Sequence, residues 1–245
     1  MVLPGQNGTG DPMTIDTYIK NLLSSYSLVT VLSKKNECQV LRLRNKSTGL
    51  DLVLRSFPKH LDVYETLCAI QCENLPEIYD AIDVEDGQIV LEEYIDGITV
   101  ADVMQTGKYH YWGAKKVLCA VCNALSVLHN RGIIHRDIKP ENVMVEKTGR
   151  VVLIDFNASR KESAAGKDTV IMGTVGYASP EQLGLSQTDA RTDIYAAGVL
   201  LNVMLTGKHP TECFAKGRAG RIVRKCTALN PDDRYQSAEK LARSL

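Results

Sequence analysis

Two polar stretches at the ends of short apolar runs constrain the fold of this chain more than any other feature. The stretch His135–Asn142 reads H-R-D-I-K-P-E-N and leads directly into the apolar run 143–145. After a turn that contains a glycine, a second apolar run, 151–154, ends at Asp155. Two such runs joined by a short turn predict a β-hairpin, and polar side chains where elements end project into clefts. We therefore expect Asp137 and Asp155 to converge on one site.

These stretches carry the residue types that phosphoryl transfer requires. The reaction depends on in-line positioning and on neutralising the charge of oxygen atoms, so it needs a carboxylate that orients a hydroxyl group, a cation and metal ligands. Asp137, Lys139, Asn142 and Asp155 supply these groups. A single Asp after Arg is usually a turn residue or part of a solvated ion pair, but the joint spacing of the four residues favours a phosphoryl-transfer site.

The pattern of apolar residues changes along the chain from strands to helices. Short apolar runs bounded by Gly, Pro and Asn predict a small antiparallel sheet in the first part. Apolar residues at three- and four-residue spacing predict helices in the second part. The expected strands cover 28–32, 40–43, 52–54, 77–82 and 88–94, and the expected helices cover 63–70, 114–128 and the almost entirely apolar segment 194–205.

Two further stretches downstream complete a recognisable series. Residues 173–181 read G-T-V-G-Y-A-S-P-E, and residues 192–198 read T-D-I-Y-A-A-G. Together with His135–Asn142 and the D-F-N sequence at 155–157, they resemble the motifs of eukaryotic-type serine/threonine protein kinases, and of bacterial members most. The resemblance extends from about Leu28 to the end of the chain.

The resemblance implies an α+β fold in two lobes that together form one kinase domain. An N-terminal tail and lead-in would cover 1–25, and its first part, Met1 to Pro12, is expected to be disordered because it is rich in Gly and Pro. A small antiparallel-sheet N-lobe that binds the nucleotide would cover 26–96. A mainly helical C-lobe, with the catalytic and substrate-binding residues, would cover 97–245.

The resemblance also assigns a role to each candidate residue. Asp137 would accept or orient the proton of the substrate hydroxyl group, and Lys139 would contact the transferred phosphoryl group. Asn142 and Asp155 would hold Mg²⁺ ions. ATP would be the donor, and a protein with a serine or threonine acceptor would be the substrate, as Lys139 and Thr174 indicate. The nucleotide-binding residues would be Val40, Val53, Arg55, Glu93, Ile95 and Met144.

The nucleotide-binding half departs from the family pattern. The stretch Ser33–Val40 stands where a glycine-rich loop is usual, and it contains no glycine. Arg55 replaces the usual lysine, and its longer planar side chain need not reproduce the contacts of that lysine. Glu65 and Glu92 are both candidates for the acidic partner of Arg55. Asn157 replaces the glycine of D-F-G, and Asn tolerates a left-handed backbone better than most residues.

Several residues are expected to support or regulate the site rather than react. Asp193 would accept hydrogen bonds from the backbone of the catalytic loop, and Arg234 would pair with Glu181. Candidate acceptors for regulatory phosphorylation are Ser159, Ser163 and Thr169.

Three functions are open at this point. The departures cluster on the handling of ATP phosphates while the transfer residues persist, so we expect a serine/threonine protein kinase. The alternatives are a pseudokinase that binds a nucleotide or a partner, and a kinase-like phosphotransferase that acts on a small molecule.

Charge and cysteine content narrow the expected partners and location. The chain has 29 Lys and Arg residues against 29 Asp and Glu residues, so its overall charge attracts neither nucleic acid nor an anionic membrane. We therefore predict no nucleic-acid partner. Its seven cysteines lack the spacing of a disulfide framework, which is typical of reduced thiols in a cytoplasmic protein. No signal pattern and no sufficiently long apolar segment appears, so we expect no membrane segment in this chain.

Overall fold

The structure is a computed structural model of the chain. It describes residues 13–35, 38–162, 174, 176–183 and 187–245. The segment expected to be disordered, Met1 to Pro12, lies outside the described residues. The chain forms two compact units: unit 1 comprises Met1–Ile70 and Pro76–Tyr94, and unit 2 comprises Gln71–Leu75 and Ile95–Leu245.

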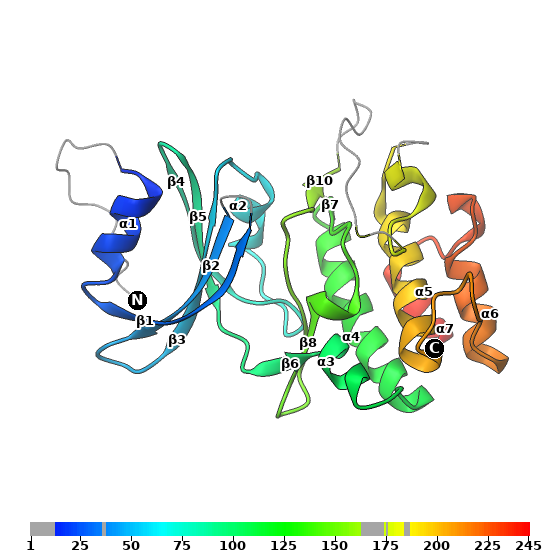
Figure 1. Cartoon of the computed structure of the whole chain (residues 1–245). Coiled ribbons are helices and arrows are strands. Elements are labelled where there is room, and N and C mark those ends of the chain that lie inside the picture. The colour runs from blue at the N-terminus through cyan, green and yellow to red at the C-terminus, as the bar shows by residue number, and fades with distance from the viewer. Residues whose placement is uncertain (1–12, 36–37, 163–173, 175, 184–186) are drawn as a thin grey trace. The chain divides into compact units, whose positions relative to one another are not determined.

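The described residues of unit 1 form five strands and two helices, which Figure 1 labels. The strands are β1 (Tyr26–Lys35), β2 (Cys38–Asn45), β3 (Asp51–Phe57), β4 (Ile78–Val84) and β5 (Gly87–Glu93), and the helices are α1 (Ile15–Leu22) and α2 (Val63–Leu67). The strands form one antiparallel sheet in the order β1-β2-β3-β5-β4. This confirms the small antiparallel sheet predicted from the sequence, whereas α2 is shorter than the helix expected over 63–70.

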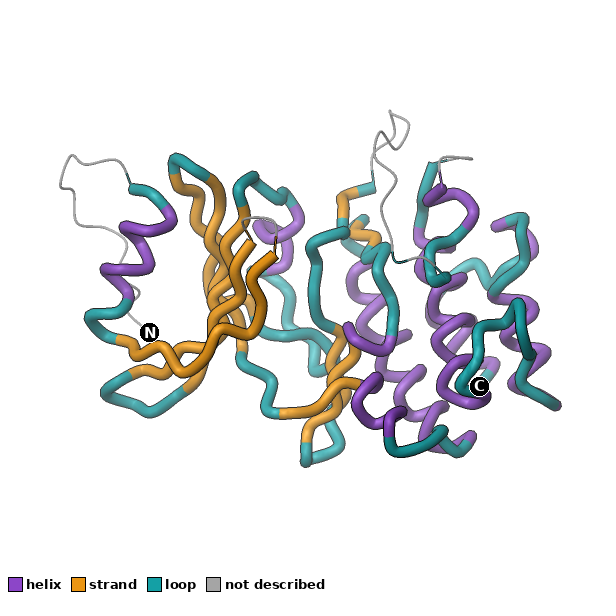
Figure 2. Tube along the Cα trace, in the orientation of Figure 1, coloured by secondary structure: helices purple, strands orange, loops and turns teal. Residues whose placement is uncertain are grey.

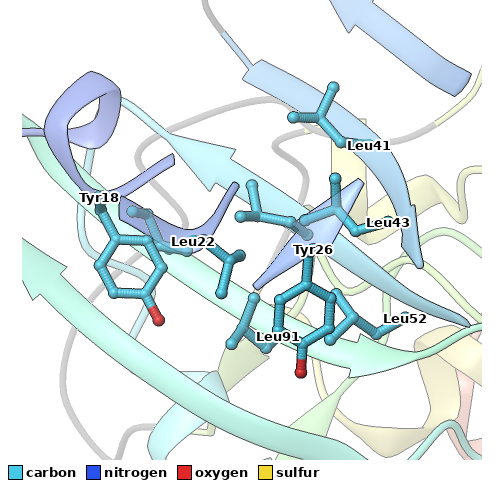
Figure 3. Close-up of a cluster of buried hydrophobic side chains, with 9 residues drawn as sticks. Tyr18, Leu22, Tyr26, Leu41, Leu43, Leu52 and Leu91 are labelled. Carbon is cyan, nitrogen blue, oxygen red and sulfur yellow. The ribbon is translucent and has the colours of Figure 1, made fainter. Parts of the chain in front are cut away.

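Helix α1 packs on one face of this sheet. The hydroxyl group of Thr14 caps the helix by accepting a hydrogen bond from the N–H of Thr17 over 3.3 Å. Tyr18 and Leu22 lie one turn apart and are buried against leucines of the sheet (Figure 3). The segment 1–25 is expected from the sequence to be a tail and lead-in, whereas its residues 15–22 form a helix because this apolar stripe is buried. The buried cluster comprises Tyr18, Leu22, Tyr26, Leu41, Leu43, Leu52, Leu54, Ile89 and Leu91.

The strand register places several candidate nucleotide-binding side chains on the opposite face. Val40 is paired with Arg55 between β2 and β3, and Val53 is paired with Glu92 between β3 and β5. Paired residues of neighbouring strands point to the same side of a sheet, as do alternate residues of one strand. These four residues therefore share one face, and Leu54 and the cluster under α1 occupy the other.

Unit 2 is mainly helical (Figure 2). Its helices are α3 (Val100–Gln105), α4 (Tyr111–His129), α5 (Ala190–Thr206), α6 (Gly217–Cys226) and α7 (Ala238–Ser244), with short 3₁₀ turns η1 (Pro140–Asn142), η2 (Pro180–Leu183) and η3 (Pro231–Asp233). One antiparallel sheet contains β6 (Gly97–Thr99), β8 (Val143–Glu146) and β9 (Val151–Leu153), and β7 (Ile133–Ile134) pairs with β10 (Arg160–Lys161). The β8–β9 pair is the hairpin predicted from the two apolar runs.

Helix α5 forms the buried centre of unit 2, as its almost entirely apolar sequence predicts. Asp189 caps its first turn by accepting a hydrogen bond from the N–H of Arg191 over 2.7 Å. Gly207 ends the helix with a left-handed backbone, φ 72°. Gly198 permits the close approach of α6, because a Cβ atom at position 198 would lie 2.2 Å from the Cβ atom of Cys226.

The antiparallel sheet of unit 1 and the helices of unit 2 confirm the predicted α+β fold class. All seven cysteines, each of which the structure describes, are free thiols. Within the part of the chain that the structure describes, every helix is too short or too polar to traverse a lipid bilayer.

Candidate active site

The carboxylate of Asp137 lies at the centre of a hydrogen-bond network in unit 2. Lys139 Nζ donates to Asp137 Oδ2 over 2.7 Å, and Asn142 Nδ2 donates to the same oxygen over 2.8 Å. Thr174 Oγ1 donates to Asp137 Oδ1 over 2.7 Å and accepts a hydrogen bond from Lys139 Nζ over 2.8 Å. The structure thus brings together three candidate residues of the catalytic stretch and the threonine of a segment that follows much later in the chain.

The surroundings of Asp137 keep its carboxylate charged. Burial alone would raise the pKa of Asp137, but the hydrogen bonds from Lys139 and Thr174 outweigh this effect and lower the pKa below its ordinary value. Asp137 is therefore ionised at neutral pH and can only accept hydrogen bonds.

Asp193, on α5, holds the backbone of the loop that carries Asp137. Its buried carboxylate accepts hydrogen bonds from the N–H groups of His135, over 2.9 Å, and Arg136, over 2.8 Å, and from Nε2 of His129, over 2.8 Å. Burial would raise the pKa of Asp193, but the hydrogen bond from His129 and those from the backbone lower it instead. The contact to the catalytic-loop backbone is the one that the sequence predicted for Asp193.

The ring of His135 connects this loop to the segment of Asp155. Its Nε2 lies 3.3 Å from the carbonyl oxygen of Ile154, and its Nδ1 accepts a hydrogen bond from the N–H of Asp137 over 3.3 Å. Full burial lowers the pKa of His135, so the ring is neutral and carries its proton on Nε2. The negative charges of Asp193, Asp155 and Asp137 oppose this decrease in pKa without reversing it.

Two non-glycine residues of the site have a left-handed backbone. The φ angle is 68° at Arg136 and 70° at Asp155. This conformation costs about 1 kcal/mol and persists only where neighbouring groups hold it. Gln182 Nε2 holds Arg136 from one side by donating to its carbonyl oxygen over 2.8 Å, while Asp193 binds its N–H group. The left-handed residue of the D-F-N sequence is therefore Asp155, and Asn157 does not need the backbone tolerance that its identity suggested.

Asn142 and Asp155 offer oxygen atoms suited to a divalent metal ion. Asn142 Nδ2 donates to both the carbonyl and the carboxylate oxygens of Asp137, over 2.9 and 2.8 Å. This leaves Asn142 Oδ1 without a hydrogen-bond donor among the described residues. The N–H of Ile154 donates to the carbonyl oxygen of Asn142 over 2.9 Å, which keeps the segments of Asn142 and Asp155 adjacent. Amide and carboxylate oxygens are ligands that Mg²⁺ prefers, so this pair fits the predicted metal site.

Glu181 and Arg234 form the ion pair that the sequence predicted. Nη1 of Arg234 lies 2.6 Å from Oε1 of Glu181, and Nη2 lies 2.9 Å from Oε2. The two residues are 3% and 2% exposed, so the pair is buried. Burial would raise the pKa of Glu181, but Arg234 outweighs this effect and the pKa is lowered. Thr192 Oγ1 also donates to this carboxylate, over 3.0 Å, and so connects the pair to α5.

In unit 1, the acidic partner of Arg55 is Glu92. Nε of Arg55 lies 2.6 Å from Oε1 of Glu92, and the two side chains are only 9% and 4% exposed. The other candidate, Glu65, is 62% exposed and lies 3.8 Å from Nε2 of His60. The choice that the sequence left open is therefore decided in favour of Glu92.

The remaining predicted nucleotide-binding residues are divided between the two units. Val40 on β2, Val53 on β3 and Glu93 at the end of β5 belong to unit 1. Ile95, which is buried, and Met144 on β8 belong to unit 2. Residues 36–37, which connect β1 and β2 in the sequence, lie outside the described residues. The nucleotide contacts of these side chains stay predictions.

One of the three candidate phosphorylation acceptors lies in the described part of the chain. Ser159 Oγ donates a hydrogen bond to the carbonyl oxygen of His135 over 3.1 Å, and the residue is 9% exposed. This burial disfavours Ser159 as an acceptor. Ser163 and Thr169 lie outside the described residues.

Comparison with known proteins identifies the family. The family described as "Protein kinase domain" matches residues 55–243. The chain belongs to the protein kinase family. This result confirms the resemblance predicted from the sequence. The match begins at Arg55, so the glycine-free hairpin before it lies outside the matched range of this kinase domain.

The relatives of this kinase domain include bacterial enzymes. The serine/threonine-protein kinase PknB of Mycolicibacterium smegmatis is 31% identical over 200 residues, which cover 69% of this chain and 32% of the relative. PknB of Mycobacterium tuberculosis is 33% identical over 184 residues, which cover 64% of this chain and 29% of the relative. The serine/threonine-protein kinase D of Synechocystis is 28% identical over 225 residues, which cover 82% and 44%. The chain thus spans about a third of the length of the PknB relatives.

Two supporting residues of this kinase domain were not predicted from the sequence. His129 is the last residue of α4 and donates to Asp193, which lies 64 positions later in the chain. Gln182 follows Glu181 and donates to the carbonyl oxygen of Arg136. A histidine at the end of a helix and a glutamine in a short turn are common on protein surfaces, so their sequence positions carry no signal of these contacts.

Proposed function

We propose that this chain is a serine/threonine protein kinase that transfers the γ-phosphate of ATP to a hydroxyl group of a protein. The observation that carries the proposal is the network in which Lys139, Asn142 and Thr174 surround the ionised carboxylate of Asp137. The names of the relatives, which are serine/threonine-protein kinases, support the same acceptor class.

Asp137 orients the acceptor hydroxyl group in the proposed reaction. A carboxylate has about four lone-pair sites. Lys139 and Asn142 donate to Oδ2, and Thr174 donates to Oδ1, so Oδ1 keeps a site for the hydroxyl hydrogen of the substrate. Lys139, which already lies 2.7 Å from Asp137, contacts the phosphoryl group as it passes to that hydroxyl oxygen.

Asn142 and Asp155 hold Mg²⁺ in the proposed site. The bound metal neutralises charge on the phosphate oxygens. The chain's own contribution is the position of its ligands: Asn142 Nδ2 is held by Asp137, which aims Oδ1 away from that carboxylate, and the left-handed backbone at Asp155 sets the direction of its side chain.

The proposal assigns ATP recognition to the nucleotide-binding residues predicted from the sequence. Arg55 contacts phosphate oxygens, and Glu92 acts as the positioning residue that fixes its guanidinium group. We retain 26–96 as the nucleotide-binding lobe and 97–245 as the catalytic lobe. The other residues proposed to contact the nucleotide are Val40, Val53, Glu93, Ile95 and Met144. Because ATP and reduced thiols are typical of the cytosol, we place the activity in the cytoplasm.

Phosphate transfer from γ-labelled ATP tests the proposal. Three versions of one peptide, with Ser, Thr or Tyr as the acceptor, are compared with and without Mg²⁺. We expect label on the Ser and Thr peptides, little label on the Tyr peptide, and no label after chelation of the metal. ATP binding without transfer to any peptide would contradict the proposal and indicate a pseudokinase instead.

A further inference from the structure

A cavity of about 500 Å³ in unit 2 has no role in the proposed kinase reaction. It lies where the C-terminal end of α5 meets the loop that leads into α6 and the segment that leads into α4. None of the residues that line it belongs to the Asp137 network, the metal ligands or the nucleotide-binding set. Phosphoryl transfer therefore does not account for its chemistry.

The lining of the cavity is cationic. Lys108, Lys208 and Lys216 come from different segments and all line it, and no Asp or Glu is among the lining residues. The ammonium groups of these three lysines have no ion-pair or hydrogen-bond partner in the part of the chain that the structure describes. Cations gathered around a concave surface without a counter-charge concentrate anions there.

The first turn of α6 adds to the positive potential. Lys216 is the N-cap of this ten-residue helix, its side chain does not cap the turn, and the first turn contains no acidic residue. Lys216 and Ala219 of this turn both line the cavity. The N–H groups at the start of a helix carry partial positive charge and bind anions.

The loop that lines the cavity is held by a buried side chain. Asn202 Nδ2 donates to the carbonyl oxygens of Lys208, over 2.8 Å, and Cys213, over 2.7 Å. Asn202 Oδ1 accepts a hydrogen bond from the N–H of Ala215 over 2.8 Å. Since Asn202 is fully buried, the loop is fixed at three points, and the cavity is organised before a ligand enters.

The cavity also has apolar walls. The ring of Tyr111 is fixed because its hydroxyl group donates to the carbonyl oxygen of Leu245 over 2.7 Å. The ring of Phe214 lies 4.8 Å from the guanidinium carbon of Arg224. Leu205 lines the cavity together with these two rings. A ligand that matches such a lining has an apolar body as well as a negative charge.

We propose that this cavity binds a small organic anion, in which a carboxylate, sulfonate or phosphate group is attached to an aromatic or aliphatic body. The charged group contacts Lys108, Lys208 and Lys216 and the first turn of α6, and the body packs against Tyr111 and Phe214. The volume is within the range of about 300–1,000 Å³ that small-molecule sites occupy. The site is independent of the proposed function, because it shares no residue with it.

Protection of Cys213 from alkylation tests this site directly. Cys213 is exposed and lines the cavity, whereas Cys68 is exposed in unit 1 and serves as the internal control. Anilinonaphthalenesulfonate is the probe, and N-phenylnaphthylamine is the same ring system without the sulfonate. The alkylation rates of both cysteines by iodoacetamide are followed by mass spectrometry across a titration with each compound.

We expect the sulfonate to slow the alkylation of Cys213 but not of Cys68, and the uncharged analogue to protect neither. Changing Lys108, Lys208 and Lys216 to Gln is expected to weaken the protection by about tenfold or more, since one charged hydrogen bond is worth at least that factor. A matched variant with Lys20, Lys147 and Lys240 changed to Gln, which loses the same charge elsewhere on the exposed surface, is expected to bind as the wild type does.

Three results would overturn the proposal. Cys213 alkylation that is unaffected by the sulfonate would show that the cavity does not bind it. Equal protection by the uncharged analogue would remove the role of the anion. Equal affinities of the two triple variants for the sulfonate would mean that the lysines of the cavity make no specific contact with it. Lys208→Glu, which reverses one charge without altering the others, tests the same contact, and unchanged protection of Cys213 in this variant would also contradict the proposal.

Discussion

Replacing Asp193 with Asn tests how the catalytic loop is held. The carboxylate accepts hydrogen bonds from the N–H groups of His135 and Arg136 and from Nε2 of His129. The side chain of Asn has one acceptor oxygen and an NH₂ group, so at least one of these buried donors loses its acceptor and faces another donor. A hydrogen bond to a charged group contributes about 1.5–3 kcal/mol, and a buried donor without a partner costs about 1–3 kcal/mol. We therefore expect Asp193→Asn to lower the free energy of unfolding by about 3–5 kcal/mol.

Thermal denaturation followed by circular dichroism measures this loss. In a domain of this size, each kcal/mol lowers the melting temperature by about 2–4 °C, so a decrease of roughly 6–20 °C is expected. Asp233→Asn is the control, because it makes the same chemical change at an exposed residue of η3. If Asp193→Asn lowered the melting temperature no more than Asp233→Asn does, the carboxylate would not hold the loop as described.

Three further predictions concern packing, pH and the nucleotide-binding half. Gly198→Ala is expected to lower the free energy of unfolding by about 1–3 kcal/mol, because the new methyl group would overlap the Cβ atom of Cys226 on α6. Gly113→Ala is the control, because the nearest neighbour of its new methyl group would be a side-chain atom at 3.3 Å. Equal melting temperatures of the two variants would contradict this prediction. The pKa of Glu181 is lowered in the folded chain, so the stability it provides is present above its ordinary pKa of 4.5 and is lost as the pH falls through the folded value. The difference in urea midpoint between wild type and Glu181→Gln should therefore shrink as the pH decreases below 4.5, and a constant difference would refute the sign. Glu92→Gln is expected to reduce the melting-temperature increase that ATP produces, because it removes the charged partner of Arg55. Glu65→Gln should leave that increase unchanged. A larger effect of Glu65→Gln than of Glu92→Gln would show that the wrong partner was assigned.

Motifs with fixed spacing were predicted correctly because their signals are local. The apolar runs on either side of a turn with a glycine were enough to predict the β8–β9 hairpin. The almost entirely apolar segment 194–205 was enough to predict α5. The Glu181–Arg234 pair was also predicted, although its members lie 53 positions apart, because each belongs to a recognisable motif.

Features that depend on how elements meet were not predicted. Helix α1 is buried only because the sheet offers it a leucine-lined face, and a short amphipathic segment near the start of a chain does not reveal that face. The partner of Arg55 was left open, because only the pairing of β3 with β5 shows that Glu92 shares the face of Arg55. The left-handed backbone at Asp155 was not predicted, because residue type drew attention to Asn157 instead, while the contacts around the site decide the conformation.

The rate of phosphate transfer by Asp137→Asn shows whether the carboxylate of Asp137 takes part in the reaction. Asn keeps the size of the side chain but cannot accept the hydroxyl proton, and such a group typically contributes a factor of about 100 to 10,000 in rate. We expect kcat for a serine peptide to fall by about this factor, while the melting-temperature increase produced by ATP is retained. Transfer by Asp137→Asn at the wild-type rate would contradict the assignment of Asp137 and, with it, the proposed active site.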